Sequence, residues 1–177
     1  MSWFCIATNT LAIVPAKILW DKGFIGDSLF TGLTGLASLL YHGNELDGWK
    51  MNSVAIRNTD IVLANLIVLH TVHLVIKPDI RWECSIVALP FVVYSAEMSL
   101  LVRFSTMIAY GSMCILWIFI HKKGYDLRWV LMGIVLILSE LVSFFFGNKS
   151  NYVWLHGVHH VSAFLSQYCI VKSIIKN

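Results

Sequence analysis

Long apolar stretches, separated by short polar segments, dominate the chain. A helix needs roughly 17–25 apolar residues to cross a bilayer. Seven stretches approach or reach that length: 3–20, 24–42, 59–76, 82–96, 99–120, 128–147 and 152–172. Between Cys84 and Ile120 the charged residues are Glu97 and Arg103, so we divide the fourth and fifth stretches by a turn near 95–99. The pattern predicts an all-α fold, with one domain over residues 1–177. This domain is a seven-transmembrane helical bundle whose short connections make neighbouring helices antiparallel.

Composition narrows the class of protein. Of the 177 residues, 58% are hydrophobic and only 13% are charged, whereas soluble domains carry about 25% charged residues. So few charges cannot coat a water-soluble monomer. A net charge of +3 without a basic run also argues against a nucleic-acid partner. We expect a multi-pass integral membrane protein of the endoplasmic reticulum, Golgi or plasma membrane, and the composition leaves its oligomeric state open.

The distribution of basic residues predicts the orientation. With seven spans, nine of the 13 Lys and Arg residues fall on the side opposite the N-terminus. Cytoplasmic loops carry an excess of these residues, so we expect a lumenal or extracellular N-terminus and a cytoplasmic C-terminus. The glycosylation sequon at Asn148 lies on the lumenal side, so close to two spans that a glycosylating enzyme has little reach.

Ionisable residues inside spans are costly, so each is a candidate functional residue. With seven spans, three groups that are far apart in the sequence reach the same membrane level, near the lumenal side. They are Ser38 and His42 at the end of the second span, Asp60 at the start of the third, and His156, His159 and His160 in the first two turns of the seventh. Their shared level predicts a single polar site.

The spacing of these residues points to metal chemistry. Ser38 and His42 are four residues apart, as are His156 and His160, and such pairs share a helix face. Two imidazoles at this spacing can hold one metal ion. A third from His42 leaves a fourth position open, which is typical of catalytic zinc. Zinc lowers the pKa of bound water to about 7. Asp60 can accept the released proton or orient the water, and Ser38 can donate to an oxyanion.

Other polar residues are given supporting roles. We place His159 and Tyr41 beside the ligands rather than among them, because His156 and His160 already supply the pair. Glu140 is interpreted as a boundary or network group.

Two other chemistries remain open from the residues alone. His70 and His73 lie about 15–20 Å deeper than Asp60, and we interpret them as hydrogen-bonded packing residues. Either of them can instead hold a haem, although haem leaves the shared level of the other residues unexplained. The histidines can also relay protons in a transporter or channel. Against that function, no internal repeat is visible and only the fourth span has a proline near its middle.

The motif order resembles that of the CREST superfamily of seven-helix membrane proteins. The residues that carry the resemblance are Ser-x-x-x-His ending the second span, an Asp opening the third and His-x-x-x-His in the seventh. The superfamily includes alkaline ceramidases, adiponectin and progestin receptors, proteins that remodel lipid anchors, and a myomaker-like branch. The resemblance covers the seven-span layout, and the lumenal N-terminus is similar to the ceramidase and myomaker-like branches. It implies a Zn²⁺ ion held by His42, His156 and His160, with Ser38 and Asp60 beside it.

The resemblance also implies a function. The ceramidase branch hydrolyses the amide bond of a sphingolipid, so we expect a zinc-dependent intramembrane hydrolase of a lipid amide bond, with a membrane lipid as substrate. The alternative is a non-catalytic receptor or a myomaker-like membrane-remodelling protein with a structural zinc site. The short loops depart from the family pattern because they leave out any substrate-selecting insert, and the identity of the lipid stays open.

Overall fold

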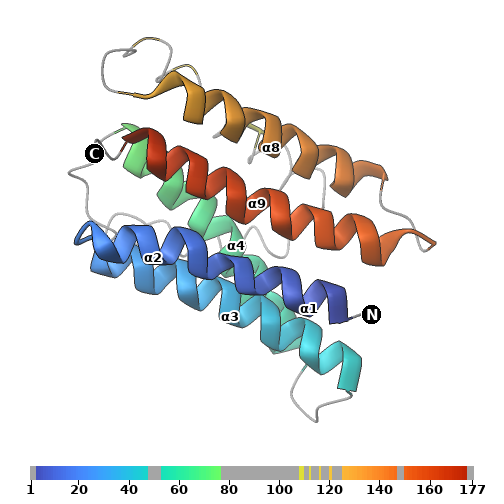
Figure 1. Ribbon diagram of the computed structural model, residues 1–177. Helices are drawn as coiled ribbons and strands as arrows, with labels where there is room; N and C mark the ends of the chain where they lie inside the picture. The colour runs from blue at the N-terminus through green and yellow to red at the C-terminus, as the bar shows by residue number, and fades with distance from the viewer. Residues whose placement is uncertain are drawn as a thin grey trace.

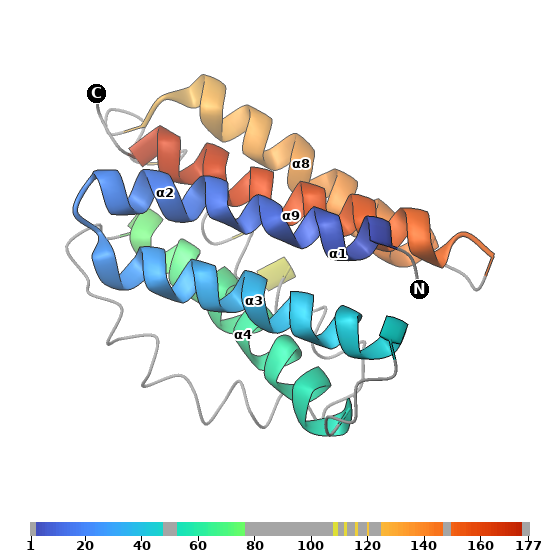
Figure 2. The same cartoon turned by 60° about the horizontal axis from the view of Figure 1, so that its bottom comes forward.

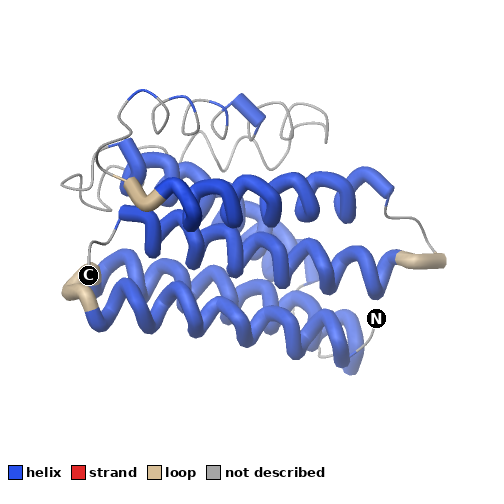
Figure 3. The backbone as a smooth tube through the Cα atoms, turned by 45° about the horizontal axis from the view of Figure 1, so that its top comes forward, coloured by secondary structure: helices blue, strands red, loops and turns tan. Residues whose placement is uncertain are grey.

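The computed structural model describes residues 3–47, 53–76, 125–146 and 150–174, together with residues 108, 109, 112, 116 and 120. Every element in these ranges is helical, and no strand occurs among them (Figure 3). The elements are α1 (Trp3–Asn9), the 3₁₀ turn η1 (Thr10–Ala12), α2 (Ile13–Asp21), α3 (Ile25–Asp47), α4 (Ser53–Ile76), α8 (Leu127–Phe146) and α9 (Tyr152–Ile174). The all-α prediction is confirmed for this part of the chain.

Helices that follow one another along the chain, such as α2 and α3 or α8 and α9, run antiparallel as predicted, whereas α9 runs parallel to α1 and α2 (Figures 1 and 2). Helix α9 packs against α8 on one side and against α1 and α2 on another, and α3 packs against α2 and α4. One end of the bundle holds the starts of α1, α4 and α9 and the ends of α3 and α8. We call it the Trp3 end, because Trp3 begins α1 there. The residues of the predicted site all belong to helix segments near this end.

The first predicted span is one helical stretch with a local defect. The turn η1 interrupts it, and Pro15 lies three residues further on. Proline has no N–H, and its ring clashes with the carbonyl four residues earlier. That position is Leu11, inside η1, which explains why the chain tightens there. The stretch ends at Asp21, and Gly23 turns the chain with a φ of +83° that favours glycine.

Most predicted helix ends agree with the structure, and one polar segment differs. The stretch 43–58 was expected to separate two spans, but α3 continues to Asp47 and α4 already begins at Ser53. Hydropathy marks where an apolar stretch ends, whereas helical hydrogen bonding can continue into a polar segment. The predicted span 82–96 lies outside the described residues, as does most of 99–120 and the sequon at Asn148. The few residues described between 108 and 120 are helical.

Small side chains bring the helices close together. A Cβ placed on Gly35 of α3 would lie 2.4 Å from the Cβ of Ala12, and one on Gly157 of α9 would lie 2.2 Å from the Cε1 of Phe4. Such contacts let helix backbones approach closely, as they do in membrane bundles. They hold α1 and η1 against both α3 and α9. The rotation of these helices about their axes therefore depends on these contacts.

Polar side chains join the helices inside the bundle. The Ser28 hydroxyl donates to the Ala16 carbonyl at 2.7 Å. The Gln167 amide donates to the Thr31 hydroxyl at 3.0 Å, in a buried contact between α9 and α3. Interhelical bonds of this kind contribute about 0.6 kcal/mol on average in membrane proteins. They link the two helices that carry the histidines.

The described surface is strongly apolar. Large hydrophobic side chains are exposed along α3 and α8, among them Leu29, Leu33, Leu36, Leu131, Val135 and Leu138. Among the residues that the structure describes, more of the buried side chains are polar than apolar. The stretch Trp3–Asp21 is the single helix in these ranges that is long and apolar enough, at a mean hydropathy of 1.3, to cross a membrane.

Candidate metal centre

Three imidazoles from two helices meet at the Trp3 end of the bundle. The Nε2 atoms of His42 and His160 are 3.0 Å apart, those of His156 and His42 are 3.1 Å apart, and those of His160 and His156 are 3.1 Å apart. His42 is fully buried, His160 is 8% exposed, and His156 is partly buried. These three residues form the candidate metal centre.

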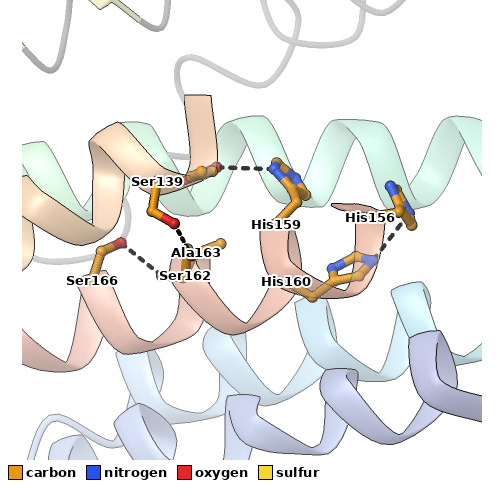
Figure 4. A network of polar contacts seen from close by, with 8 residues as sticks. Ser139, His156, His159, His160, Ser162, Ala163 and Ser166 are labelled. Atoms are coloured by element: carbon orange, nitrogen blue, oxygen red, sulfur yellow. Dashed lines mark hydrogen bonds and ion pairs between the residues drawn. The ribbon is translucent and has the colours of Figure 1, made fainter. Parts of the chain in front are cut away.

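Helix spacing and packing bring the three residues together. His156 and His160 lie one turn apart on α9 (Figure 4). His42 lies on the buried face of α3 that also carries Ser38. Their convergence was predicted from spans that are more than 110 residues apart in the sequence, and the structure confirms it.

The chemistry of the donor set fits a metal ion better than a hydrogen-bonded cluster. A neutral imidazole carries one donor and one acceptor nitrogen, so an Nε2 either donates or accepts. Among three mutually adjacent Nε2 atoms, one donor and one acceptor can pair in a hydrogen bond. The third Nε2 then has no complementary partner within the cluster. A cation accepts all three lone pairs at once.

The dimensions of the triangle also fit zinc. A tetrahedral zinc ion with bonds of about 2.0–2.1 Å separates its ligand nitrogens by about 3.3 Å. The observed separations of 3.0–3.1 Å are close to that value. His42, His156 and His160 can therefore hold one divalent ion and leave a coordination position for a small ligand.

Aromatic rings surround the three histidines. The Tyr41 ring lies 4.8 Å from that of His42, at 50°. The Tyr152 ring lies 4.8 Å from that of His156, at 15°, and the His159 ring lies 5.8 Å from it, at 17°. His159 and Tyr41 thus lie beside the centre and outside the nitrogen triangle. The contact of Tyr152 was not predicted, although its spacing of four residues from His156 offered a signal.

Ser38 lies one turn before His42 and is 3% exposed. Its Oγ has no hydrogen-bond partner among the described residues. A buried unsatisfied hydroxyl is costly, so its persistence beside a polar site is consistent with a bound ligand or substrate. Asp60 is partly buried on the second turn of α4, which packs against α3 and α9. His70 and His73 lie further along α4, and their side chains are outside the described part of the structure.

Sequence reasoning that sorted only ionisable groups missed two buried amides. Asn9 of α1 is 1% exposed and Asn44 of α3 is 6% exposed. Within the described residues, the Oδ1 atoms of both lack a hydrogen-bond partner. The Asn9 amide is held by its Nδ2, which donates to the Cys5 carbonyl at 2.9 Å. For Asn9, its place within an apolar stretch was the available signal, whereas Asn44 lies in the polar segment 43–58.

The chain was compared with protein-family models, curated proteins and solved structures. It matches none of the family models, no curated protein and no solved structure.

Proposed function

We propose that the chain is a multi-pass membrane protein of the CREST type, with seven spans, a lumenal or extracellular N-terminus and a cytoplasmic C-terminus. The main support is the distribution of side chains: long hydrophobic residues face outward while polar residues fill the interior. In water this arrangement would expose far more apolar surface than a soluble monomer tolerates. In lipid it is favourable, because the interior side chains hydrogen-bond across helices.

The proposed activity is hydrolysis of an amide bond in a membrane lipid by a zinc site of His42, His156 and His160. The observation that carries this proposal is the triangle of Nε2 atoms, each within 3.1 Å of the others. Zinc with three imidazole ligands supplies an ionisable water near neutral pH.

The roles of the neighbouring residues follow from their placement. The Oγ of Ser38 is buried, holds no partner in the described structure and lies one turn from His42. It is suited to donate to the oxygen of an attacked carbonyl. The carboxylate of Asp60, at the same end of the bundle, is suited to take up the proton released in the attack and to pass it to the leaving amine. Acyl chains would lie against the exposed apolar faces of α3 and α8.

A structural zinc site in a receptor or a membrane-remodelling protein is the second candidate. The near-complete burial of His42 and His160 favours this structural role, because a metal ion that only joins α3 to α9 needs no access for a substrate. Both candidates predict bound zinc, but only the hydrolase predicts turnover of a lipid amide.

One experiment separates these possibilities. Full-length protein, purified without added metal, should carry about one zinc per chain, and His156→Ala should carry much less. The control is His121→Ala, at a position that the sequence places between spans. Mixed ceramides in the same detergent should be hydrolysed by the wild type and by His121→Ala, and not by His156→Ala. Zinc without hydrolysis of any lipid amide would favour the structural role, and equal metal in wild type and His156→Ala would contradict the metal site.

A further inference from the structure

The imidazole of His156 lies nearly parallel to two other rings of α9, those of Tyr152 and His159, and edge-on to those of His42 and His160. Tyr152, one turn earlier, stacks on it at 4.8 Å and 15°, and His159, one turn later, lies nearly parallel at 5.8 Å and 17°. Offset stacking at such separations is favourable for aromatic rings. His156 is also the least buried of the three histidines of the centre. Its ring orientation therefore depends on contacts with neighbouring rings, Tyr152 and His159 among them, more than on enclosure by the core.

The outer ring of this stack is linked to a different helix. The Nδ1 of His159 lies 3.7 Å from the Oε1 of Glu140 on α8. The side chain of Glu140 is 15% exposed and that of His159 is 25% exposed. Figure 4 shows His159 and His160 leaving α9 in different directions, with the interaction of His159 drawn as a dashed line. The distance exceeds a hydrogen bond, but it allows electrostatic attraction in a largely buried setting.

The neighbouring contacts hold α8 in register with α9. The Ser162 hydroxyl donates to the Ser139 hydroxyl at 3.3 Å, next to Glu140. A Cβ on Gly133 would lie 3.2 Å from the Cγ1 of Ile170. The carboxylate of Glu140 is thus presented to His159 by a close helix contact. An intramembrane carboxylate is costly, which makes a specific role for it worth testing.

We propose that Glu140 is a positioning residue of the metal centre: acting through His159, it fixes the ring of His156 and thereby sets the affinity of the three-histidine site for its metal. The proposal rests on the metal site proposed above. Groups that hydrogen-bond directly to a metal ligand typically change metal affinity by about 10–100-fold, and we expect Glu140, which acts through His159, at the lower end of that range.

The test is a titration of metal-free, full-length protein in detergent with Co²⁺ alone, followed by its visible absorption. Glu140→Ala should weaken Co²⁺ binding by about tenfold or more. Because the contact with His159 is electrostatic, Glu140→Gln, which keeps the length of the side chain and loses its charge, should weaken Co²⁺ binding nearly as much as Glu140→Ala. The matched control is Ser139→Ala, which removes the adjacent contact of α8 and should leave affinity unchanged.

A double-mutant cycle tests whether Glu140 acts through His159. His159→Phe keeps an aromatic ring beside His156 and removes the contact with Glu140, so it should match Glu140→Ala. If the two residues act as a unit, the combined variant should bind no more weakly than either single variant. The melting temperature of each variant without metal should equal that of Ser139→Ala, which separates positioning from general packing.

Three results would overturn the inference. Glu140→Ala with the affinity of the wild type would refute positioning while leaving the metal site intact. Equal weakening by Ser139→Ala would assign the effect to the packing of α8. A wild-type protein that binds no Co²⁺ would refute both this inference and the proposed metal site.

Discussion

At the scale of single residues, the most informative side chain outside the nitrogen triangle is Ser38. Its hydroxyl is buried beside the centre, and its Oγ finds no partner in the described structure. Removing an unsatisfied buried polar group costs little stability and can even be favourable. A fold-stabilising serine would behave in the opposite way. Replacing Ser38 should therefore lower activity without lowering the stability of the fold.

Ser38→Ala should keep its metal and melt no lower than the wild type. Its kcat for lipid amide hydrolysis should fall by about 10²–10³-fold, the usual loss for a donor to an oxyanion. Metal analysis, thermal unfolding and turnover on one preparation check this expectation. Unchanged turnover would remove Ser38 from the chemistry, and loss of metal would show that it supports the ligands.

At the scale of elements, the close packing of η1 against α3 constrains the rotation of α3, which carries His42, about its axis. Gly35 lies in contact with Ala12, where a Cβ would come within 2.4 Å of the alanine Cβ. For Gly32, one turn away on the same helix, no described atom outside the adjoining helix backbone lies within 4 Å of such a Cβ. The two glycines differ in packing but share a helix, which makes them a matched pair.

Gly35→Ala should destabilise the protein by about 1–3 kcal/mol, because two packed backbones must move apart. Gly32→Ala should be neutral or stabilising by up to about 1 kcal/mol, since alanine favours a helix over glycine. Unfolding in mild detergent measures both. Equal effects would contradict the close approach. If the helix rotation matters to the centre, Gly35→Ala should also bind metal more weakly than Gly32→Ala.

At the scale of the whole molecule, the outward apolar faces predict burial in lipid. Leu33 of α3 is 54% exposed and Val135 of α8 is 65% exposed, and both lie within predicted spans. Asn58 is exposed on the second turn of α4, at a position that the sequence places outside a span. These positions allow the proposed membrane placement to be measured directly.

Spin labels at cysteines introduced by Leu33→Cys and Val135→Cys, in a background lacking the four native cysteines, should collide often with oxygen and rarely with a polar nickel complex. Oxygen concentrates in hydrocarbon, and the nickel complex is excluded from it. A label at Asn58→Cys should show the reverse. Power-saturation measurements in reconstituted vesicles check the three sites. A nickel response at Leu33 or Val135 as strong as at Asn58 would contradict the membrane placement.

Much of the fold and part of the centre could be predicted from the sequence. Hydrophobic stretches predicted the described helices, because a long apolar run bounded by polar residues favours a helix in lipid. Alternating helix direction then placed Ser38, His42, His156 and His160 near one end of the bundle. The long polar segment 43–58 was harder to divide, because hydropathy does not report where a helix ends within a polar segment.

Other features were decided by the tertiary structure alone. Adjacent residues on a helix point about 100° apart, so His160 can join His42 while His159 turns toward Glu140. The sequence contains both imidazoles side by side and does not say which one faces α3. The rotation of α9 selects between them, and close contacts such as Phe4 against Gly157 set that rotation. The sequence by itself determined which groups reach one end of the bundle, and packing between helices determined which of them meet.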